Sequence, residues 1–221
     1  MTLHDLLRGI EVVNPEGLPS LEVVGLHYDS RRIGPRHVFV AIQGEKTDGN
    51  RFVSAALERG AVAVVSEAPR PQAVSATWIQ VRHVRQALAL AAANFNHHPA
   101  DQLQLVGITG TNGKTTTAFL VHAMMTAAGK NAGLFGTIEY RVGGKAQPAS
   151  NTTPESLDLQ SLLAEVRDQG GTHAVLEVSS HALALDRIYG VPFRVAVFTN
   201  LTRDHLDFHG EIGRASCRER V

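Results

Sequence analysis

The sequence predicts an α/β protein with two domains, and two patterns support this. Residues 1–100 alternate short, apolar, β-branched runs with polar turns, which is typical of a small α/β domain. After residue 101, strand-like and helix-like segments alternate, and a glycine-rich loop joins the first pair. Such alternation indicates a mostly parallel sheet covered on both faces. We therefore expect a small N-terminal domain over 1–100 and the first part of a phosphate-loop central domain over 101–210.

The N-terminal domain contains four runs with the length and composition of strands. These runs are residues 21–24, 38–42, 61–65 and 78–81. Helical spacing covers residues 52–59 and stops at Gly60, and a second, alanine-rich and leucine-rich helix is expected at 84–95. Pro99 follows closely and disfavours continuation of that helix, which predicts a domain boundary near residues 97–103.

The central domain begins with a strand, a loop and a helix. The expected strands are residues 105–109, 132–137, 173–178 and 195–199, and the expected helices are 115–128 and 157–169. The glycine loop occupies residues 110–114, between the first strand and the first helix. Gly143 and Gly144 are adjacent within residues 141–145, a pattern that favours a hairpin turn.

The overall composition is that of an ordinary globular protein. Hydrophobic residues make up 43% and charged residues 19%, and 21 Lys and Arg balance 21 Asp and Glu. This balance gives no electrostatic basis for binding nucleic acid or an anionic membrane. The sequence lacks an apolar stretch long enough to span a bilayer and lacks a signal-peptide pattern at its start, so we expect a cytoplasmic protein. The single cysteine, Cys217, excludes an intrachain disulfide framework.

The last residues, 211–221, differ in character from the rest of the chain. Read back into codons, the string Glu-Ile-Gly-Arg-Ala-Ser-Cys-Arg-Glu-Arg-Val fits a translated sequencing-library adapter. We therefore expect 211–221 to be a non-native tail, with a natural basic tail as the alternative. An in-frame Glu-Ile-Gly-Arg after Gly210 in the source locus would refute the adapter interpretation.

The glycine loop has the composition of a phosphate-binding loop. Its residues are Gly110, Thr111, Asn112, Gly113, Lys114, Thr115 and Thr116. Glycines let backbone amides converge on phosphate oxygens, and a helix N-terminus adds partial positive charge. Lys114 can then reach the β- and γ-phosphates, and the Thr115 hydroxyl can ligate Mg²⁺. Only two residues separate the glycines where the usual loop has four, and a structural glycine turn is the alternative.

Two further segments place ionisable residues at predicted strand ends. Glu177 ends an apolar run, and the carboxyl ends of parallel strands collect ligands, so this acid should emerge beside the loop, where it can hold Mg²⁺. A buried structural ion pair is the alternative. Residues 199–210 form a dense polar run that includes His205. For a single histidine, the sequence alone favours a surface or hydrogen-bonded role over metal ligation.

These motifs resemble those of the Mur ligases and, through the short loop alone, their folylpolyglutamate and cyanophycin synthetase relatives. The segments Glu-Val-Ser-Ser-His at 177–181, Thr-Asn-Leu-Thr-Arg-Asp-His-Leu-Asp-Phe-His-Gly at 199–210 and Asn-Thr-Thr-Pro at 151–154 are similar to those of members that add a diamino acid. The resemblance implies ATP and Mg²⁺, with Lys114, Glu177 and His205 as catalytic residues. It also implies that Thr115, Glu177 and His205 hold the metal.

The same resemblance implies a set of substrate-binding residues. At the UDP end they are Ser30, Glu45, Lys46 and Thr47, and on the muramoyl-peptide side they are Asn151, Thr152, Thr153, Ser179 and Arg187. Hydroxyls, amides and an arginine suit a sugar and a carboxylate. Without the resemblance, the front segment would be an unremarkable strand, turn and loop. Leu185 stands where some members have a substrate-contacting Gln, so that contact is not expected here.

The resemblance implies ATP-dependent amide-bond formation. UDP-MurNAc-L-Ala-D-Glu would be activated as an acyl phosphate, and the amine of meso-diaminopimelate or L-lysine would attack it. Those two substrates are the expected partners of a monomer. The family's carbamylated lysine and C-terminal domain lie beyond the sequence, so we expect this chain to bind nucleotide weakly without turnover. A sibling ligase of the cyanophycin or folylpolyglutamate type and a non-enzymatic nucleotide-binding module are the alternatives.

Overall fold

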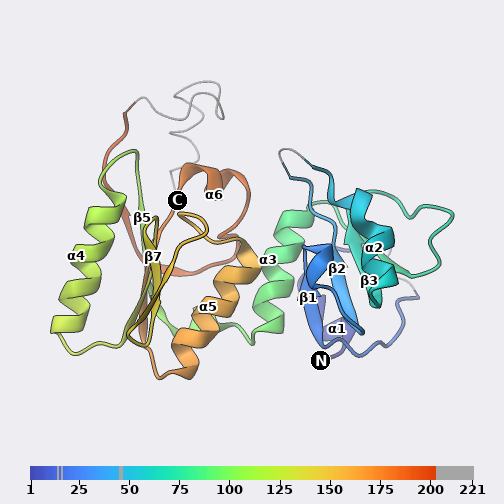
Figure 1. Ribbon diagram of the computed structural model, residues 1–221, viewed down its shortest axis with the longest axis horizontal. Coiled ribbons are helices and arrows are strands. Elements are labelled where there is room, and N and C mark those ends of the chain that lie inside the picture. Colours follow the sequence, from blue (N-terminus) through green and yellow to red (C-terminus); the bar gives the residue numbers. More distant parts are fainter. Residues whose placement is uncertain (14, 16, 45–46, 203–221) are drawn as a thin grey trace. The chain divides into compact units, whose positions relative to one another are not determined.

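The computed structural model describes residues 1–13, 15, 17–44 and 47–202. The chain divides into two compact units, Met1–Phe95 and Asn96–Val221, each with its own sheet (Figure 1). The division falls at the start of the region where the sequence predicts a boundary. Within the described residues, no helix combines the length and apolar character that crossing a bilayer requires.

The first unit contains a four-stranded parallel sheet in the order β1-β2-β3-β4. The strands are β1 (Gly25–His27), β2 (His37–Val40), β3 (Ala61–Ser66) and β4 (Thr77–Gln80). The predicted strand at 21–24 is wrong: this segment holds only an isolated bridge from Glu22 to Thr2. The segment divides its hydrogen bonds between two partners, because Val23 bonds to Met1 whereas the Val24 amide bonds to the Arg36 carbonyl, so no continuous ladder forms.

Helices cover both faces of this first sheet. Helix α2 (Val53–Glu58) packs on one face, whereas α3 (Val84–Phe95) lies on the other with α1 (Leu3–Leu6) against it (Figure 1). Short 3₁₀ helices at Ser30–Arg32 and Gly49–Phe52 follow the carboxyl ends of β1 and β2. The predicted helices at 52–59 and 84–95 are therefore confirmed, the second with identical bounds.

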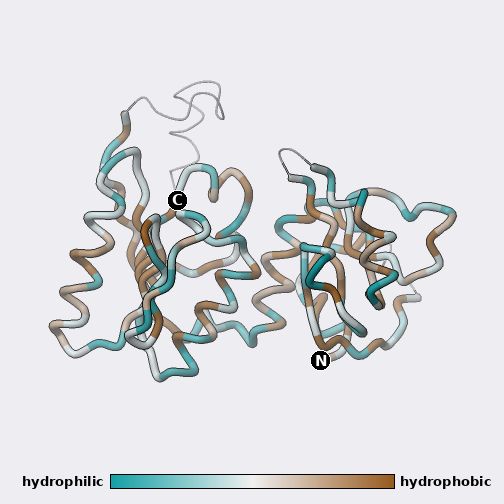
Figure 2. The backbone as a smooth tube through the Cα atoms, viewed as in Figure 1, coloured by the Kyte–Doolittle hydropathy of each residue, from teal (hydrophilic) through white to brown (hydrophobic). Residues whose placement is uncertain are grey.

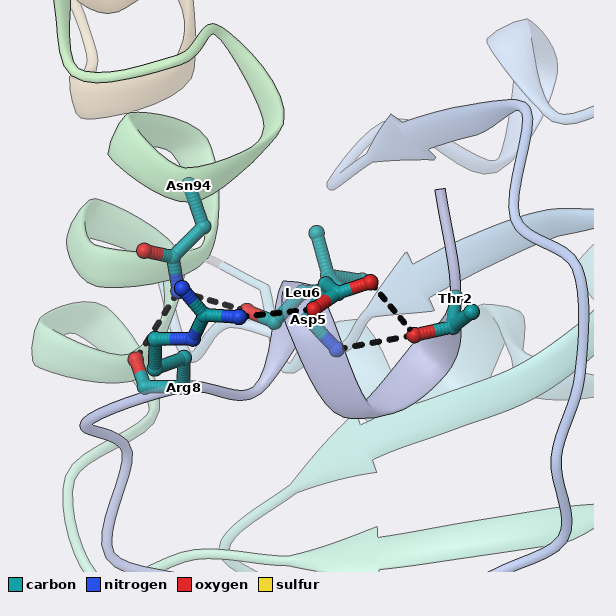
Figure 3. A network of polar contacts seen from close by, with 5 residues as sticks. All are labelled: Thr2, Asp5, Leu6, Arg8 and Asn94. Carbon is teal, nitrogen blue, oxygen red and sulfur yellow. Dashed lines mark hydrogen bonds and ion pairs between the residues drawn. The ribbon is translucent and has the colours of Figure 1, made fainter.

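A buried amide connects α3 to the start of the chain. Asn94 is 8% exposed, and its side-chain nitrogen donates hydrogen bonds of 2.9 Å to the carbonyls of Leu6 and Arg8 (Figure 3). Nearby, Thr2 caps α1 by accepting from the Asp5 amide. This buried polar residue of α3 thus satisfies carbonyls at and just after the end of α1.

The second unit contains a six-stranded sheet in the order β10-β5-β9-β6-β7-β8. The strands are β5 (Gln104–Thr109), β6 (Ala132–Phe135), β7 (Glu139–Val142), β8 (Lys145–Pro148), β9 (His173–Glu177) and β10 (Phe193–Phe198). Strands β10, β5, β9 and β6 are parallel to one another. Strand β7 pairs antiparallel with both β6 and β8. The predicted hairpin is confirmed, because Gly143 and Gly144 have φ 52 and 81 at its turn.

Two long helices enclose this second sheet. Figure 1 shows α4 (Lys114–Ala127) on one face and α5 (Ser156–Asp168) on the other. Successive residues of β9 pack toward the two helices. Val175 is in one core cluster with Ala118 of α4, and Leu176 is in another with Leu163 of α5. The tube in Figure 2 accordingly is apolar along the central strands of this unit. The predicted α/β class with a mostly parallel sheet is confirmed.

Candidate phosphate-loop and substrate site

The phosphate loop connects β5 to α4 through two glycines with positive φ. Gly110 has φ +125, and a Cβ placed there would lie 2.2 Å from Thr199 Oγ1 and 2.8 Å from the Asn200 carbonyl. Gly113 has φ +86 and directly precedes the first residue of α4. Thr115 and Thr116 lie in the first turn, where helix geometry leaves backbone amides without intrahelical partners. The loop therefore presents the donors that a phosphate requires.

Lys114 lies within this loop. Its Nζ donates hydrogen bonds of 2.7 Å to the Gly110 carbonyl and 3.0 Å to the Thr111 carbonyl. These contacts hold the ammonium over the glycine turn, next to the first-turn amides. A cation and several amide donors thus share one small region, which suits a multiply charged anion.

Thr199 and Asn200, which follow β10, form hydrogen bonds with the phosphate loop. The Asn200 carbonyl accepts from the Thr111 amide at 2.9 Å, and Asn200 Oδ1 accepts from the Asn112 amide at 3.1 Å. Thr199 Oγ1 donates to the Asn112 carbonyl at 2.7 Å. Sequence reasoning placed this polar run at a site but assigned no role to Thr199 or Asn200; their position directly after a parallel strand was the available signal.

Glu177 ends β9 and is fully buried beside the phosphate loop. Its Oε2 accepts a 2.9 Å hydrogen bond from the Thr115 hydroxyl. Oε2 also accepts from the Thr137 hydroxyl at 3.0 Å, and Oε1 accepts from the Thr137 amide at 3.0 Å. The predicted strand at 132–137 ends earlier, at Phe135, because residues 136 and 137 turn toward this carboxylate. Three donors compensate the burial of the charge, and none of them comes from a basic residue.

Residues predicted for the muramoyl-peptide side gather around the same strand end. The Thr153 hydroxyl donates to the Glu177 carbonyl at 2.9 Å and accepts from the Ser179 amide at 3.0 Å. Arg187 Nη1 donates to the Thr153 carbonyl at 3.1 Å, and its Nε lies 3.5 Å from Glu155 Oε2. Ser179 also caps the short helix α6 (Ser180–Ala184). The structure therefore brings Thr153, Ser179 and Arg187 together.

Asn151 and Thr152, the two residues before Thr153, lie nearer to solvent than Thr153 does. Thr152 Oγ1 lies 3.2 Å from Thr137 Oγ1, which links it to the carboxylate cluster. Asn151 is exposed, and its backbone rather than its side chain is held, by the Tyr140 hydroxyl. This loop is therefore fixed through the backbone of an exposed residue.

In the first unit, Ser30 and Thr47 line one cavity of about 460 Å³. This cavity lies at the carboxyl ends of β1 and β2, the edge where ligands gather on parallel sheets. Asp29 and Arg31 also line it, and the hydrogen bonds from Arg31 hold the pKa of Asp29 at about 2. Glu45 and Lys46 are outside the described residues.

The oxygen donors around Glu177 fit a magnesium ion. Mg²⁺ prefers oxygen ligands and is usually held by one or two carboxylates together with substrate phosphates. Glu177 and the Thr115 hydroxyl supply such oxygens within 2.9 Å of each other. Within the part of the chain that the structure describes, no group of three or more His, Cys, Asp and Glu could hold a metal on its own. His205, the other predicted ligand, lies outside that part.

This fold and loop define the phosphate-loop class of α/β domains, preceded here by a small α/β unit. Residues 22–96 match the profile of the Mur ligase family, catalytic domain, and residues 108–215 match the Mur ligase middle domain. The second match runs into segment 211–221, whose predicted non-native origin stays a prediction. The chain belongs to the Mur ligase family, as its motifs predicted.

Curated relatives carry a common name. A protein named UDP-N-acetylmuramoyl-L-alanyl-D-glutamate–2,6-diaminopimelate ligase, from Solibacter usitatus, is 53% identical over 97% of this chain and 44% of its own length. A protein of the same name from Geobacter metallireducens is 48% identical over 96% of this chain and 42% of its length. The chain thus spans less than half the length of these relatives.

Solved structures show the same fold. A structure of a ligase with that name superposes with a TM-score of 0.79 at 30% identity, covering 99% of this chain and 44% of its own. A MurF ligase from Thermotoga maritima, solved in complex with ADP, superposes with a TM-score of 0.57 at 25% identity, covering 88% of this chain and 41% of its own.

Proposed function

We propose that this chain carries the UDP-substrate unit and the first part of the ATP-binding unit of a ligase that adds a diamino acid to UDP-MurNAc-L-Ala-D-Glu. One observation carries the proposal: the Thr115 hydroxyl, at the start of the helix after the phosphate loop, donates to the buried carboxylate of Glu177. Phosphate-loop enzymes use this pair of residue types to hold the magnesium of a nucleoside triphosphate. Mur ligases are ATP-dependent, which agrees with this use.

The loop residues bind and orient the triphosphate in this proposal. Residues Gly110 to Thr116 surround the phosphates, and the amides at the start of α4 bind them while those of Thr111 and Asn112 bond to Asn200. Lys114 exchanges its loop carbonyls for the β- and γ-phosphates. Thr115, Glu177 and His205 would hold magnesium, which would supply screening of the phosphate charge for conversion of the D-Glu carboxylate to an acyl phosphate. Glu177 is fixed before nucleotide arrives, so little reorganisation is needed.

The remaining predicted residues bind the muramoyl dipeptide and the UDP group. Arg187 is oriented by the Thr153 carbonyl and by Glu155, which suits recognition of a carboxylate by a guanidinium. Asn151, Thr152 and Ser179 would bind beside it. In the first unit, Ser30, Thr47, Glu45 and Lys46 would bind the UDP end at the 460 Å³ cavity.

The relatives' names favour 2,6-diaminopimelate over L-lysine as the amino acid that is added. The proposal includes a cytoplasmic, monomeric enzyme that binds neither nucleic acid nor membrane, as expected from its UDP-linked substrate and balanced charge. The sibling-ligase alternative would gain support if a polyamino acid bound and UDP-muramoyl dipeptide did not.

Nucleotide binding tests the proposal directly. Titration of this chain with ADP in millimolar Mg²⁺, followed by isothermal calorimetry, should give measurable binding. Lys114→Ala should weaken that binding by at least tenfold, because it removes the cation that lies over the glycine turn.

Lys130→Ala provides the matched control, since Lys130 is an exposed lysine beyond the other end of α4. This variant should bind ADP as the unsubstituted chain does. Equal affinity of the Lys114→Ala variant and the unsubstituted chain would contradict the proposal.

A further inference from the structure

The geometry points to Thr137 as a positioning residue that holds the Glu177 carboxylate ready for the metal. This inference rests on the proposed function, because it concerns the same nucleotide-magnesium site. Thr137 follows β6, the strand next to β9, so its turn lies at the same edge of the sheet as Glu177. It does not belong to the phosphate loop or to the predicted metal ligands.

Thr137 contacts both oxygens of the carboxylate. Its amide donates to Glu177 Oε1 at 3.0 Å, and its hydroxyl donates to Oε2 at 3.0 Å. Two donors from one residue, one on each oxygen, define the plane of the carboxylate. The Thr115 hydroxyl then meets Oε2 at 2.9 Å from the phosphate-loop side. Without the Thr137 hydroxyl, each carboxylate oxygen would keep a single donor, and rotation about the last side-chain bond would be restrained less tightly.

Gly136 makes room for this arrangement. A Cβ at Gly136 would lie 2.1 Å from Glu177 Oε1 and 2.9 Å from the carboxyl carbon. The absence of a side chain at Gly136 therefore leaves space for the Glu177 carboxylate, and Thr137 binds that carboxylate. Thr137 is exposed, but the Glu177 side chain is fully buried, so its carboxylate would have few alternative partners within the protein if it lost one of its donors.

The Thr137 hydroxyl also lies 3.2 Å from Thr152 Oγ1. Thr152 is one of the residues proposed to bind the muramoyl dipeptide. One hydroxyl group thus connects the carboxylate of the metal site to the loop of the second substrate. Thr137 orients groups that act and needs no contact of its own with the reacting atoms.

The magnesium dependence of nucleotide binding separates this role from a purely structural one. We would measure ADP affinity of this chain across a range of Mg²⁺ concentrations and in EDTA. Thr137→Val removes the hydroxyl and keeps the shape and the backbone amide. It should raise the Mg²⁺ concentration for half-maximal effect by about fivefold or more, with ADP affinity in EDTA unchanged. Thr137→Ser retains a hydroxyl and should restore the magnesium response of the unsubstituted chain.

Thr126→Val serves as the matched control. The Thr126 hydroxyl bonds to the His122 carbonyl near the far end of α4, and its loss should leave the magnesium response intact. A magnesium response of Thr137→Val within twofold of the unsubstituted chain, or failure of Thr137→Ser to restore it, would overturn the role of Thr137. The proposed function would survive that result if Lys114→Ala still weakened binding. Absence of ADP binding by the unsubstituted chain would overturn both.

Discussion

At the scale of single residues, buried polar groups indicate positions with a specific structural or functional role. Glu177 is fully buried, and within the described residues its carboxylate accepts hydrogen bonds from two hydroxyls and an amide. Removing an ionised group from water is costly unless it is hydrogen-bonded, and an apolar residue would fill the space at lower cost. The burial of this acid beside the loop is consistent with the proposed role of Glu177 in holding magnesium.

Asn94 is the comparable buried residue of the first unit, and its role is structural. Asn94→Ala should lower the free energy of unfolding of that unit by about 1–3 kcal/mol, because the carbonyls of Leu6 and Arg8 would lose their donor. Urea unfolding followed by circular dichroism would measure the change. Gln86→Ala, a partly exposed position on the same helix, should change stability far less. An equal effect of the two substitutions would argue against the bonds drawn in Figure 3.

At the scale of elements, the phosphate loop depends on its close contact with the segment after β10. Gly110→Ala should abolish ADP binding, because the added methyl group would meet Thr199 Oγ1 and the Asn200 carbonyl and displace the loop. Isothermal calorimetry would detect the loss.

Gly129→Ala separates this steric effect from backbone strain. Gly129 also has a positive φ, +72, but a Cβ there would meet nothing within 4 Å. This control should cost about 1 kcal/mol of stability and retain ADP binding. Binding by Gly110→Ala at full affinity would show that the loop does not need this close approach.

The elements also show which local patterns are reliable. The Gly143-Gly144 turn was predictable because a two-residue hairpin needs positive φ at both positions, which glycine adopts without strain. The segment 21–24 has strand-like composition and is not a strand, because its hydrogen bonds are divided between the first residues of the chain and Arg36 and form only an isolated bridge. Strand formation requires a partner, and composition does not reveal where a partner begins.

At the scale of the molecule, the predicted ligand should act mainly on the second unit. At about one hundred times its Kd, ADP with Mg²⁺ should stabilise the unit that binds it by about 2.7 kcal/mol. Hydrogen exchange should therefore slow in residues 104–127, which contain β5, the loop and the body of α4. At the same ADP concentration, a tenfold weaker Lys114→Ala variant should gain only about 1.4 kcal/mol and show correspondingly less protection. Protection confined to Met1–Phe95 would indicate that the nucleotide binds the first unit, which would contradict this prediction.

Much of the site was accessible to sequence reasoning because it is local. The phosphate loop is seven consecutive residues, and Glu177 follows an apolar run whose end must lie at the ligand-binding edge of a parallel sheet. Thr137, Thr199 and Asn200 were not assigned roles, although they obey the same rule. Their hydrogen bonds join strands that are distant in sequence, and hydroxyl and amide side chains are common in ordinary turns.

The sequence by itself determined the α/β class, through short-range patterns of apolar periodicity and glycine placement. It also determined the family, through the resemblance of its motifs to those of the Mur ligases. Only the tertiary structure decided that β5, β9 and β6 lie side by side, so that Thr115, Glu177 and Thr137 meet at one buried carboxylate. Strand order is set by the packing of whole layers, and no single segment of the chain encodes it.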